Sequence, residues 1–179
     1  KYRKTYKTAY IKPLARAGAE YVLNFVNEEA IMNKIRTVIE VESPIEESCL
    51  IDKIAAAFCV PKTAKKAIAQ ISRYVSSYEA QRQEYFGKVF YVDKPVSTFR
   101  PSDARVTRDL TKVHPHEIVA AAKCAIEATV YIEKDDLNKE VFKLFNVAKR
   151  TKSAVEWVDA ALSAAVQTGE IIVTPDGFC

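Results

Sequence analysis

The sequence predicts a mainly helical α+β protein that consists of two similar small domains. Hydrophobic residues make up 49% of the 179 residues and charged residues 28%, a balance typical of globular chains that bury a core. Apolar residues recur at helical spacing over most of the chain, and short apolar runs beside glycine and proline indicate strands with tight turns. An internal repeat indicates that this arrangement occurs twice.

The repeat emerges when the chain is compared with itself at a shift of 87 residues, the separation of Leu50 from Leu137. Further pairs match at the same shift: Ile31/Ile118, Ile39/Ile126, Ile45/Ile132, Ile54/Val141, Phe58/Phe145, Val60/Val147, Lys62/Lys149, Lys65/Lys152, Ala67/Ala154, Ile68/Val155 and Ile71/Val158. Two copies are too few for a solenoid. We therefore expect two domains, at residues 27–93 and 116–179.

The segments outside the two copies have a different character. Residues 1–26 are expected to be an extension from an upstream domain, partly helical around 15–25, because the chain starts without methionine and resembles a piece of a longer protein. Its tyrosines, Tyr2, Tyr6 and Tyr10, alternate with basic residues; they could stack on single-stranded bases, but we favour packing on an upstream domain. Residues 94–115 are polar and basic, which predicts a connector.

Three helices are predicted in the first copy. The first contains Ile31, Ile35, Val38 and Ile39 at helical spacing. The second is expected to open at Ser43–Pro44–Ile45–Glu46, which has the pattern of a capping box with proline in the first turn. The third is expected to start near Thr63, a residue suited to an N-cap, and to turn Ala67, Ile68, Ile71, Tyr74 and Val75 inward.

The second copy repeats these helices. Its first helix should begin at Pro115 and carry an apolar stripe that includes Ile118 and Ile126. Its second should run from about Asp135 to Phe145. A capping box at Ser153–Ala154–Val155–Glu156 predicts the start of the third, whose inward residues would be Val155, Val158, Leu162 and Val166.

Each third helix is followed by glycine and an apolar run, which predicts a strand. These runs are 86–92 in the first copy and 168–173 in the second, where a turn at 174–177 and Phe178 complete a hairpin. Three helices with a tight turn before the third, followed by a hairpin, is the order of a helix-turn-helix with a β wing. The sequence therefore predicts two tandem winged-helix-like domains with small β wings.

The run 39–45, followed by Leu50 and Ile54–Ala55, resembles a known signature, V-x-x-E-G-P-I … L … R-L-A. This signature belongs to a C-terminal domain of unknown function in large bacterial superfamily I helicase-like proteins. Residues 100–108 are similar to that family's arginine-bearing linker and residues 116–118 to the start of its second half, so the resemblance covers about residues 35–178. Ser43 stands where the family usually has glycine, and Lys53 where it has arginine.

The resemblance implies that this chain is the non-catalytic tail of an ATP-dependent, cytoplasmic DNA-processing protein. The helicase motifs and any nuclease motif would then lie upstream.

The sequence gives little support for an enzyme, and we assign no catalytic residue, cofactor, metal or small-molecule ligand. The four glycines form no phosphate-binding loop, and no apolar run reaches the ~20 residues of a membrane helix. His114 and His116 with Cys124 lack the spacing of a zinc site. The acidic pairs Glu46–Glu47 and Asp135–Asp136 are expected to stabilise helix starts, and the four cysteines are expected to be buried thiols in a reducing compartment.

The placement of basic residues favours a nucleic-acid partner, although the net charge is only +4 at pH 7. The candidate DNA-binding residues are Lys62, Lys65, Lys66, Arg73, Lys88, Lys149, Arg150 and Lys152. The linker adds Arg100, Arg105 and Arg108. No Asn or Gln accompanies the basic residues where the third helices begin, so we expect non-specific phosphate contacts. The alternative is a protein-interaction module that docks on the upstream helicase or nuclease domains.

Overall fold

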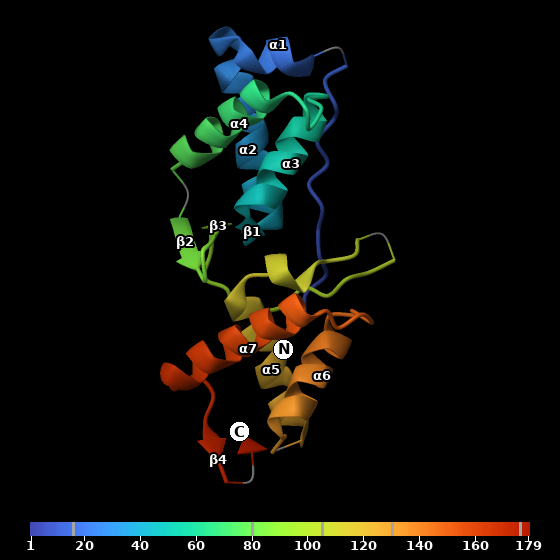
Figure 1. The fold of residues 1–179 in the computed structure, drawn as a ribbon, viewed down its shortest axis with the longest axis vertical. Helices are drawn as coiled ribbons and strands as arrows, with labels where there is room; N and C mark the ends of the chain where they lie inside the picture. Colours follow the sequence, from blue (N-terminus) through green and yellow to red (C-terminus); the bar gives the residue numbers. More distant parts are fainter. Residues whose placement is uncertain (16, 80, 105, 130, 176) are drawn as a thin grey trace. The chain divides into compact units, whose positions relative to one another are not determined.

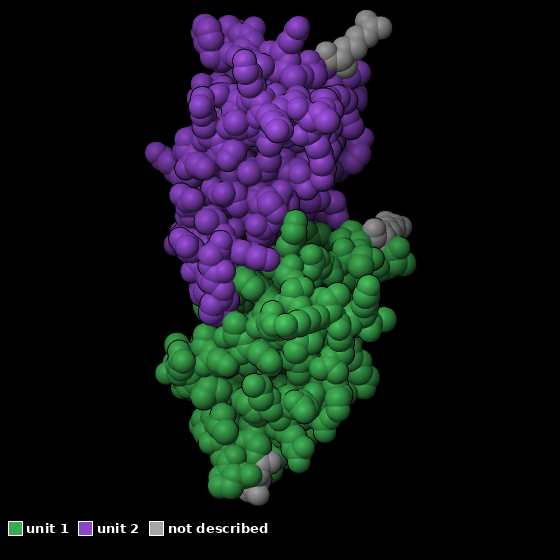
Figure 2. All heavy atoms as spheres, in the orientation of Figure 1, with its two compact units in different colours: residues 1–6, 96–179 green, residues 7–95 purple. Residues whose placement is uncertain are grey.

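The computed structural model describes residues 1–15, 17–79, 81–104, 106–129, 131–175 and 177–179. The chain divides into two compact units (Figure 2). The N-terminal unit contains residues 7–95, and the C-terminal unit contains residues 96–179 together with residues 1–6. Both units are mainly helical with a small antiparallel sheet, which confirms the α+β class.

Three helices and a hairpin make up most of the N-terminal unit (Figure 1). The helices predicted at 31–39, after Ser43 and after Thr63 are all present. The elements in chain order are α1 (Gly18–Leu23), η1 (Phe25–Asn27), α2 (Glu28–Glu42), β1 (Ile45–Glu46), α3 (Glu47–Ala57), α4 (Lys65–Ser77), β2 (Gln81–Tyr85) and β3 (Lys88–Val92).

The sheet of the N-terminal unit has the order β1-β3-β2, with both pairings antiparallel. The sequence did not predict β2, because Gln81–Tyr85 is polar and largely exposed. The predicted strand was expected to begin at Phe86, but Phe86 and Gly87 form the turn between β2 and β3, where Tyr85 pairs with Lys88.

The predicted N-caps of α3 and α4 are wrong by three residues and one residue, respectively. Ser43 ends α2, and its hydroxyl accepts a hydrogen bond from the Asp93 N–H (2.6 Å). Glu46 caps α3 instead, accepting from the Cys49 N–H (3.2 Å). The reason is that Ile45 is paired with Tyr91 in the sheet, so the helix cannot begin there. The helix α4 starts after Ala64 rather than Thr63, with no side-chain cap.

Helices α2, α3 and α4 enclose the core of the N-terminal unit. Each supplies fully buried aliphatic side chains, such as Ile35, Leu50 and Ile71. Phe58 is also fully buried and stacks on Tyr21 with ring centroids 5.4 Å apart. Burial of each such side chain stabilises the fold by about 1.5–3 kcal/mol.

The C-terminal unit repeats the helical order. Its elements are η2 (Leu110–Lys112), α5 (Pro115–Thr129), α6 (Lys134–Leu144), α7 (Lys152–Gln167), β4 (Val173–Thr174) and β5 (Gly177–Phe178). The helix α5 begins at Pro115, as predicted. The aromatic residues Phe142, Phe145 and Trp157 are buried in its core.

The start of α7 differs from the prediction, and its inward face changes with it. Thr151, not Ser153, caps the helix by accepting from the Ala154 N–H. Trp157 and Ala161 are buried, together with the predicted Val158 and Leu162, whereas Val155 and Val166 are only half-buried. Small alanine side chains let the neighbouring helices approach α7 on that face. The prediction missed this face because it considered only the large apolar residues.

The hairpin after α7 is shorter than the predicted strand. Gly169 follows the helix with a positive φ of 73°, and Ile172 exchanges backbone hydrogen bonds with Cys179 (3.0 and 2.9 Å). Only Val173 of the predicted 168–173 run lies in β4. One residue of the predicted turn, Asp176, lies outside the described residues.

The segment predicted to be a polar connector, residues 94–115, is mostly part of the C-terminal unit. Phe99, Leu110 and Val113 within it are buried. Phe99 also pairs with the start of the chain: the Lys4 N–H donates to its carbonyl (2.9 Å), and its N–H donates to the carbonyl of Tyr2 (2.7 Å). The polar composition of this segment suggested an exposed connector, but these three buried apolar residues anchor it in the unit.

The cysteines and the helix lengths complete the description. All four cysteines lie within the described residues and form no disulfide; Cys59 is exposed and the others are half-buried, so the prediction of buried thiols is wrong. Cys59 lies just after α3, where its backbone has a positive φ of 54°. Among the described residues, every helix is too short or too polar to span a bilayer.

Replacing Gly177 by alanine should destabilise the C-terminal unit. The backbone at Gly177 has a φ of +131°, and an added Cβ would lie 2.7 Å from the Ile132 carbonyl oxygen, where the Phe178 N–H donates a 3.0 Å hydrogen bond. We expect a loss of about 2–3 kcal/mol in the free energy of unfolding, measured by urea denaturation.

The control is Gly169→Ala, which has a similar backbone requirement (φ +73°) but no atom within 4 Å of the added Cβ. Its cost should be about 1 kcal/mol. Equal losses in the two variants would contradict the close approach of Gly177 to Ile132.

Candidate functional site

The helix α4 carries the most concentrated basic surface of the N-terminal unit. Lys65 and Lys66 form its first turn, Arg73 lies two turns further, and all three side chains are exposed. The helix sequence, KKAIAQISRYVSS, contains no acidic residue. At 1.5 Å per residue, the cations extend over about 12 Å of the helix. This surface, Lys65, Lys66 and Arg73, is hereafter the α4 basic face.

The lysines of the α4 basic face do not stabilise their own helix. The first turn of a helix has a partial positive charge, so cations there cost up to about 1 kcal/mol each. α4 also lacks a side-chain cap. Helix stability therefore gives no reason for Lys65 and Lys66 at these positions, whereas an external anion would.

The two remaining candidates in the N-terminal unit are less prominent. Lys62 lies just before α4, and its Nζ is 3.5 Å from Asp52 in an exposed ion pair that contributes little. Lys88 is half-buried at the start of β3. The sequence analysis missed Arg82, which is exposed on β2 with its guanidinium 3.8 Å from Glu47. It was missed because β2 itself was not predicted.

The equivalent cluster in the C-terminal unit is partly engaged within the protein. Lys149, Arg150 and Lys152 are exposed where α7 begins. However, Arg150 donates to Asn138 Oδ1 (3.0 Å) and lies over the Phe142 ring, 5.5 Å from its centroid. Lys152 is 3.8 Å from Glu156. At the 87-residue shift, Lys152 matches Lys65, whereas Arg150 falls on Thr63 and the partners of Lys66 and Arg73 are Ser153 and Ala160.

Two of the three linker arginines are structural. Arg100 and Arg108 bind Glu117, whose carboxylate is completely buried in the first turn of α5. Arg100 Nε and Nη2 donate to its two oxygens at 2.6 and 3.0 Å, and Arg108 Nη1 and Nη2 at 3.2 and 2.8 Å. The prediction that these arginines contact phosphates is therefore wrong. Arg105 lies outside the described residues.

The charge of Glu117 is stabilised by its two partners. Burial alone would raise the pKa of its carboxyl, but the charges of Arg108 and Arg100 and their hydrogen bonds hold that pKa below its ordinary value. We refer to Glu117, Arg100 and Arg108 as the buried ion triad.

Two N-terminal tyrosines pack within the chain, against expectation. The ring of Tyr6 lies over both arginines of the buried ion triad, with guanidinium carbons 5.1 and 4.8 Å from its centroid. The Tyr2 hydroxyl donates to Glu127, which also pairs with Lys1. Tyr10 is 86% exposed. Of the three tyrosines, only Tyr10 keeps the exposure expected of a residue that contacts another domain.

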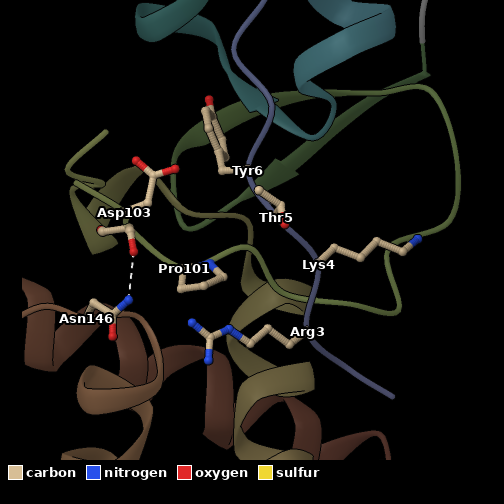
Figure 3. A pocket seen from close by; sticks show the side chains of 8 residues that line it. Arg3, Lys4, Thr5, Tyr6, Pro101, Asp103 and Asn146 are labelled. Atoms are coloured by element: carbon tan, nitrogen blue, oxygen red, sulfur yellow. Dashed lines mark hydrogen bonds between the residues drawn. The ribbon is translucent and has the colours of Figure 1, made fainter. Parts of the chain in front are cut away.

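A pocket of about 440 Å³ lies beside residues 3–6 in the C-terminal unit (Figure 3). The side chain of Arg3 points toward Asn146, and that of Lys4 points away. Asn146 donates to the Ser102 carbonyl (2.7 Å). The residues that line the pocket are Arg3, Lys4, Thr5, Tyr6, Pro101, Ser102, Asp103 and Asn146. They include no histidine or cysteine.

The two histidines, His114 and His116, lie at the start of α5. His114 is fully buried, and its Nδ1 accepts from the His116 N–H (3.2 Å), which caps the helix. Burial, and then the proximity of His116, lower the pKa of His114 from 6.5 to about 4. Within the described part of the chain, no group of three or more His, Cys, Asp or Glu side chains could hold a metal ion.

No family model, curated protein or solved structure matches this chain.

Replacing Glu117 by glutamine should destabilise the C-terminal unit strongly. The substitution leaves two nearly buried arginines without a compensating charge, which costs about 3–5 kcal/mol. Urea denaturation measures the loss. Glu170→Gln is the control: it breaks the part-exposed pair with Lys123 (2.9 Å) and should cost about 1 kcal/mol or less. Similar small losses for both variants would show that the buried ion triad does not support the unit.

The stability of the protein should fall as the pH drops from 7.5 to 5, and His114 should contribute about 2 kcal/mol of the loss. Below its ordinary pKa of 6.5 the unfolded chain takes up a proton on this residue, whereas the folded chain resists protonation until about pH 4. Urea denaturation at both pH values tests this effect. His114→Asn keeps an N-cap acceptor without titrating, so its pH dependence should be smaller by that amount; an unchanged dependence would contradict the assignment.

Proposed function

We propose that this chain is a non-catalytic module that binds DNA, with the α4 basic face as its principal contact. The supporting observation is that Lys65 and Lys66 are exposed in the first turn of α4, where they oppose the helix dipole. DNA phosphates would compensate these charges and release the counterions that the DNA holds.

The order of elements supports a winged-helix type for the N-terminal unit. Its core order is α2, β1, α3, α4 and the β2–β3 hairpin, with α4 as the third helix. In a helix-turn-helix with a wing, this helix is the one that enters the major groove. The C-terminal unit has the order α5, α6, α7 and β4–β5, and we infer the same type for it.

The remaining cations would be auxiliary contacts. Lys62 and Lys88 lie next to α4 and in the hairpin, and Lys149, Arg150 and Lys152 form a second contact at the start of α7. The first turn of α4 contains no Asn or Gln to read base edges. The contact would therefore be with phosphates and without sequence preference.

The resemblance to the C-terminal domain of bacterial helicase-like proteins supports the proposal that this module belongs to a DNA-processing protein. In that setting the module would hold duplex or forked DNA near the motor, and the catalytic residues would lie on other domains. The assignment to a cytoplasmic helicase-like parent has this resemblance as its only support.

The second candidate is a protein-docking module, which an exposed apolar patch favours. Leu23, Phe25 and Val26 at the α1–η1 junction are 48%, 79% and 73% exposed. Contiguous exposed apolar side chains often mark protein contacts. This candidate predicts that Phe25→Ser with Val26→Ser abolishes binding to the upstream domains or self-association, both measurable by sedimentation.

Charge reversal on α4 should weaken DNA binding at least tenfold. The double variant Lys65→Glu with Lys66→Glu removes two phosphate contacts and adds repulsion. Fluorescence anisotropy with a labelled duplex at about 50 mM salt measures the affinity, and circular dichroism verifies the fold.

The matched control is Lys7→Glu with Lys12→Glu, which changes the net charge equally at exposed positions of the same unit. This variant should bind within about threefold of wild type if placement rather than net charge matters. Wild-type affinity in the α4 variant, or an equal loss in the control, would refute the assignment of the α4 basic face.

A further inference from the structure

The pocket of about 440 Å³ in the C-terminal unit contains an arginine side chain without a compensating charge. The guanidinium of Arg3 is directed toward Asn146 (Figure 3). Among the residues that the structure describes, none forms a hydrogen bond or ion pair with this guanidinium. Asp103, the acidic residue of the lining, directs its carboxylate away from Arg3 (Figure 3) and accepts a hydrogen bond from the Val106 N–H (2.9 Å). The donors of the Arg3 guanidinium are therefore available to a ligand in the pocket.

The walls of this pocket are held in place by the fold of the C-terminal unit. The backbone of Arg3 forms a parallel bridge with Phe99, and the hydrogen bonds on either side of this bridge are 2.9 and 2.7 Å long. Asn146, toward which Arg3 points, donates to the Ser102 carbonyl (2.7 Å). Walls that are ordered before a ligand arrives lose little conformational freedom when it binds.

The surroundings of the pocket carry a net positive charge. The ring of Tyr6, which also lines the pocket, lies 5.1 and 4.8 Å from the two guanidinium carbons of the buried ion triad. The triad contains two arginines and one carboxylate, so it retains one positive charge. Lys4 adds another at the edge of the pocket. The summed charge favours an anionic ligand.

The lining suits a phosphate group better than a carboxylate. A guanidinium binds either group through two parallel hydrogen bonds. A phosphomonoester, however, carries nearly two negative charges at neutral pH and has three acceptor oxygens. Besides Arg3, Thr5 and Asn146 contribute a hydroxyl and an amide to the lining. The pocket volume of about 440 Å³ lies in the range of small-molecule sites.

We propose that this pocket binds a phosphomonoester, with the Arg3 guanidinium as the principal contact to the phosphate. Phosphorylated small molecules and the 5′ ends of DNA strands both carry this group, and the test below separates the two sources. The inference goes beyond DNA binding by the α4 basic face, which lies in the other unit of the chain.

The test is an NMR titration of the isotope-labelled chain in phosphate-free buffer. The probes are glycerol 3-phosphate, acetate, and trithymidylate with and without a 5′-phosphate. Glycerol 3-phosphate should shift the backbone amide signals of Arg3, Thr5, Ser102 and Asn146, and acetate should bind at least tenfold more weakly because of its smaller charge. Tenfold tighter binding of the phosphorylated trinucleotide assigns the site to DNA ends. Equal binding of both trinucleotides assigns it to small molecules.

Two substitutions in neighbouring residues identify the contact. Arg3→Gln removes the guanidinium and should weaken glycerol 3-phosphate binding at least tenfold. The matched control is Lys4→Gln, which changes the net charge equally, but its side chain points away from the pocket (Figure 3). This variant should bind within about twofold of wild type. Circular dichroism and urea denaturation verify that both variants fold.

The inference is overturned if glycerol 3-phosphate leaves these signals unchanged, if acetate binds as tightly, or if Arg3→Gln binds like wild type. Equal losses in Arg3→Gln and Lys4→Gln would also overturn it, because the anion would then respond to net charge alone. None of these results bears on the α4 basic face. Conversely, the double variant Lys65→Glu with Lys66→Glu should bind glycerol 3-phosphate like wild type, so the two proposals fail separately.

Discussion

The buried ion triad is the constraint on which the C-terminal unit depends. A carboxylate that is completely buried must be compensated by opposite charge and hydrogen bonds, and Glu117 obtains both from Arg100 and Arg108. The triad joins the segment before α5 to the first turn of that helix. Tyr6 covers the two guanidinium groups, and residues 2–4 pair with Phe99. The start of the chain is therefore part of this unit's fold.

The basic residues of the protein include a buried group, Arg100 and Arg108 in the triad, and an exposed group. Arginine is suited to the buried group, because its planar guanidinium binds a carboxylate with two hydrogen bonds at once. Lysines dominate the exposed group, including both cations in the first turn of α4. The functional proposal depends on this division, since only a cation that remains exposed can contact phosphate. The modest net charge of +4 therefore says less about a DNA partner than the placement of a few lysines.

The sequence predicted the parts of the fold that arise from local patterns. Helical spacing predicted α2, α4, α5 and α6, and the apolar run at 86–92 predicted a strand that includes β3. Local patterns failed where a distant contact decides the structure. Pairing of Ile45 with Tyr91 moved the start of α3 beyond the apparent capping box.

The sequence predicted only part of the candidate site, because distant contacts decide the rest. The exposure of the α4 cations follows from their helix phase, whereas nothing local indicates that Arg100 and Arg108 converge on Glu117, 17 and 9 residues away. Arg82 and the role of Phe86 as a turn residue depend on β2, whose polar sequence carries no strand signal.

The two units repeat one order of elements with different surfaces. The third helix of the N-terminal unit keeps its basic face largely exposed, while Arg150 and Lys152 at the start of α7 have partners in Asn138, Phe142 and Glu156.

The most direct test of this account is the affinity of the wild-type chain for duplex DNA as a function of salt concentration. If Lys65, Lys66 and Arg73 each contact a phosphate, the logarithm of the binding constant should fall linearly with the logarithm of the salt concentration, with a slope of about −2.7 or steeper. A slope near zero, or no binding at the lowest salt concentration, would contradict it.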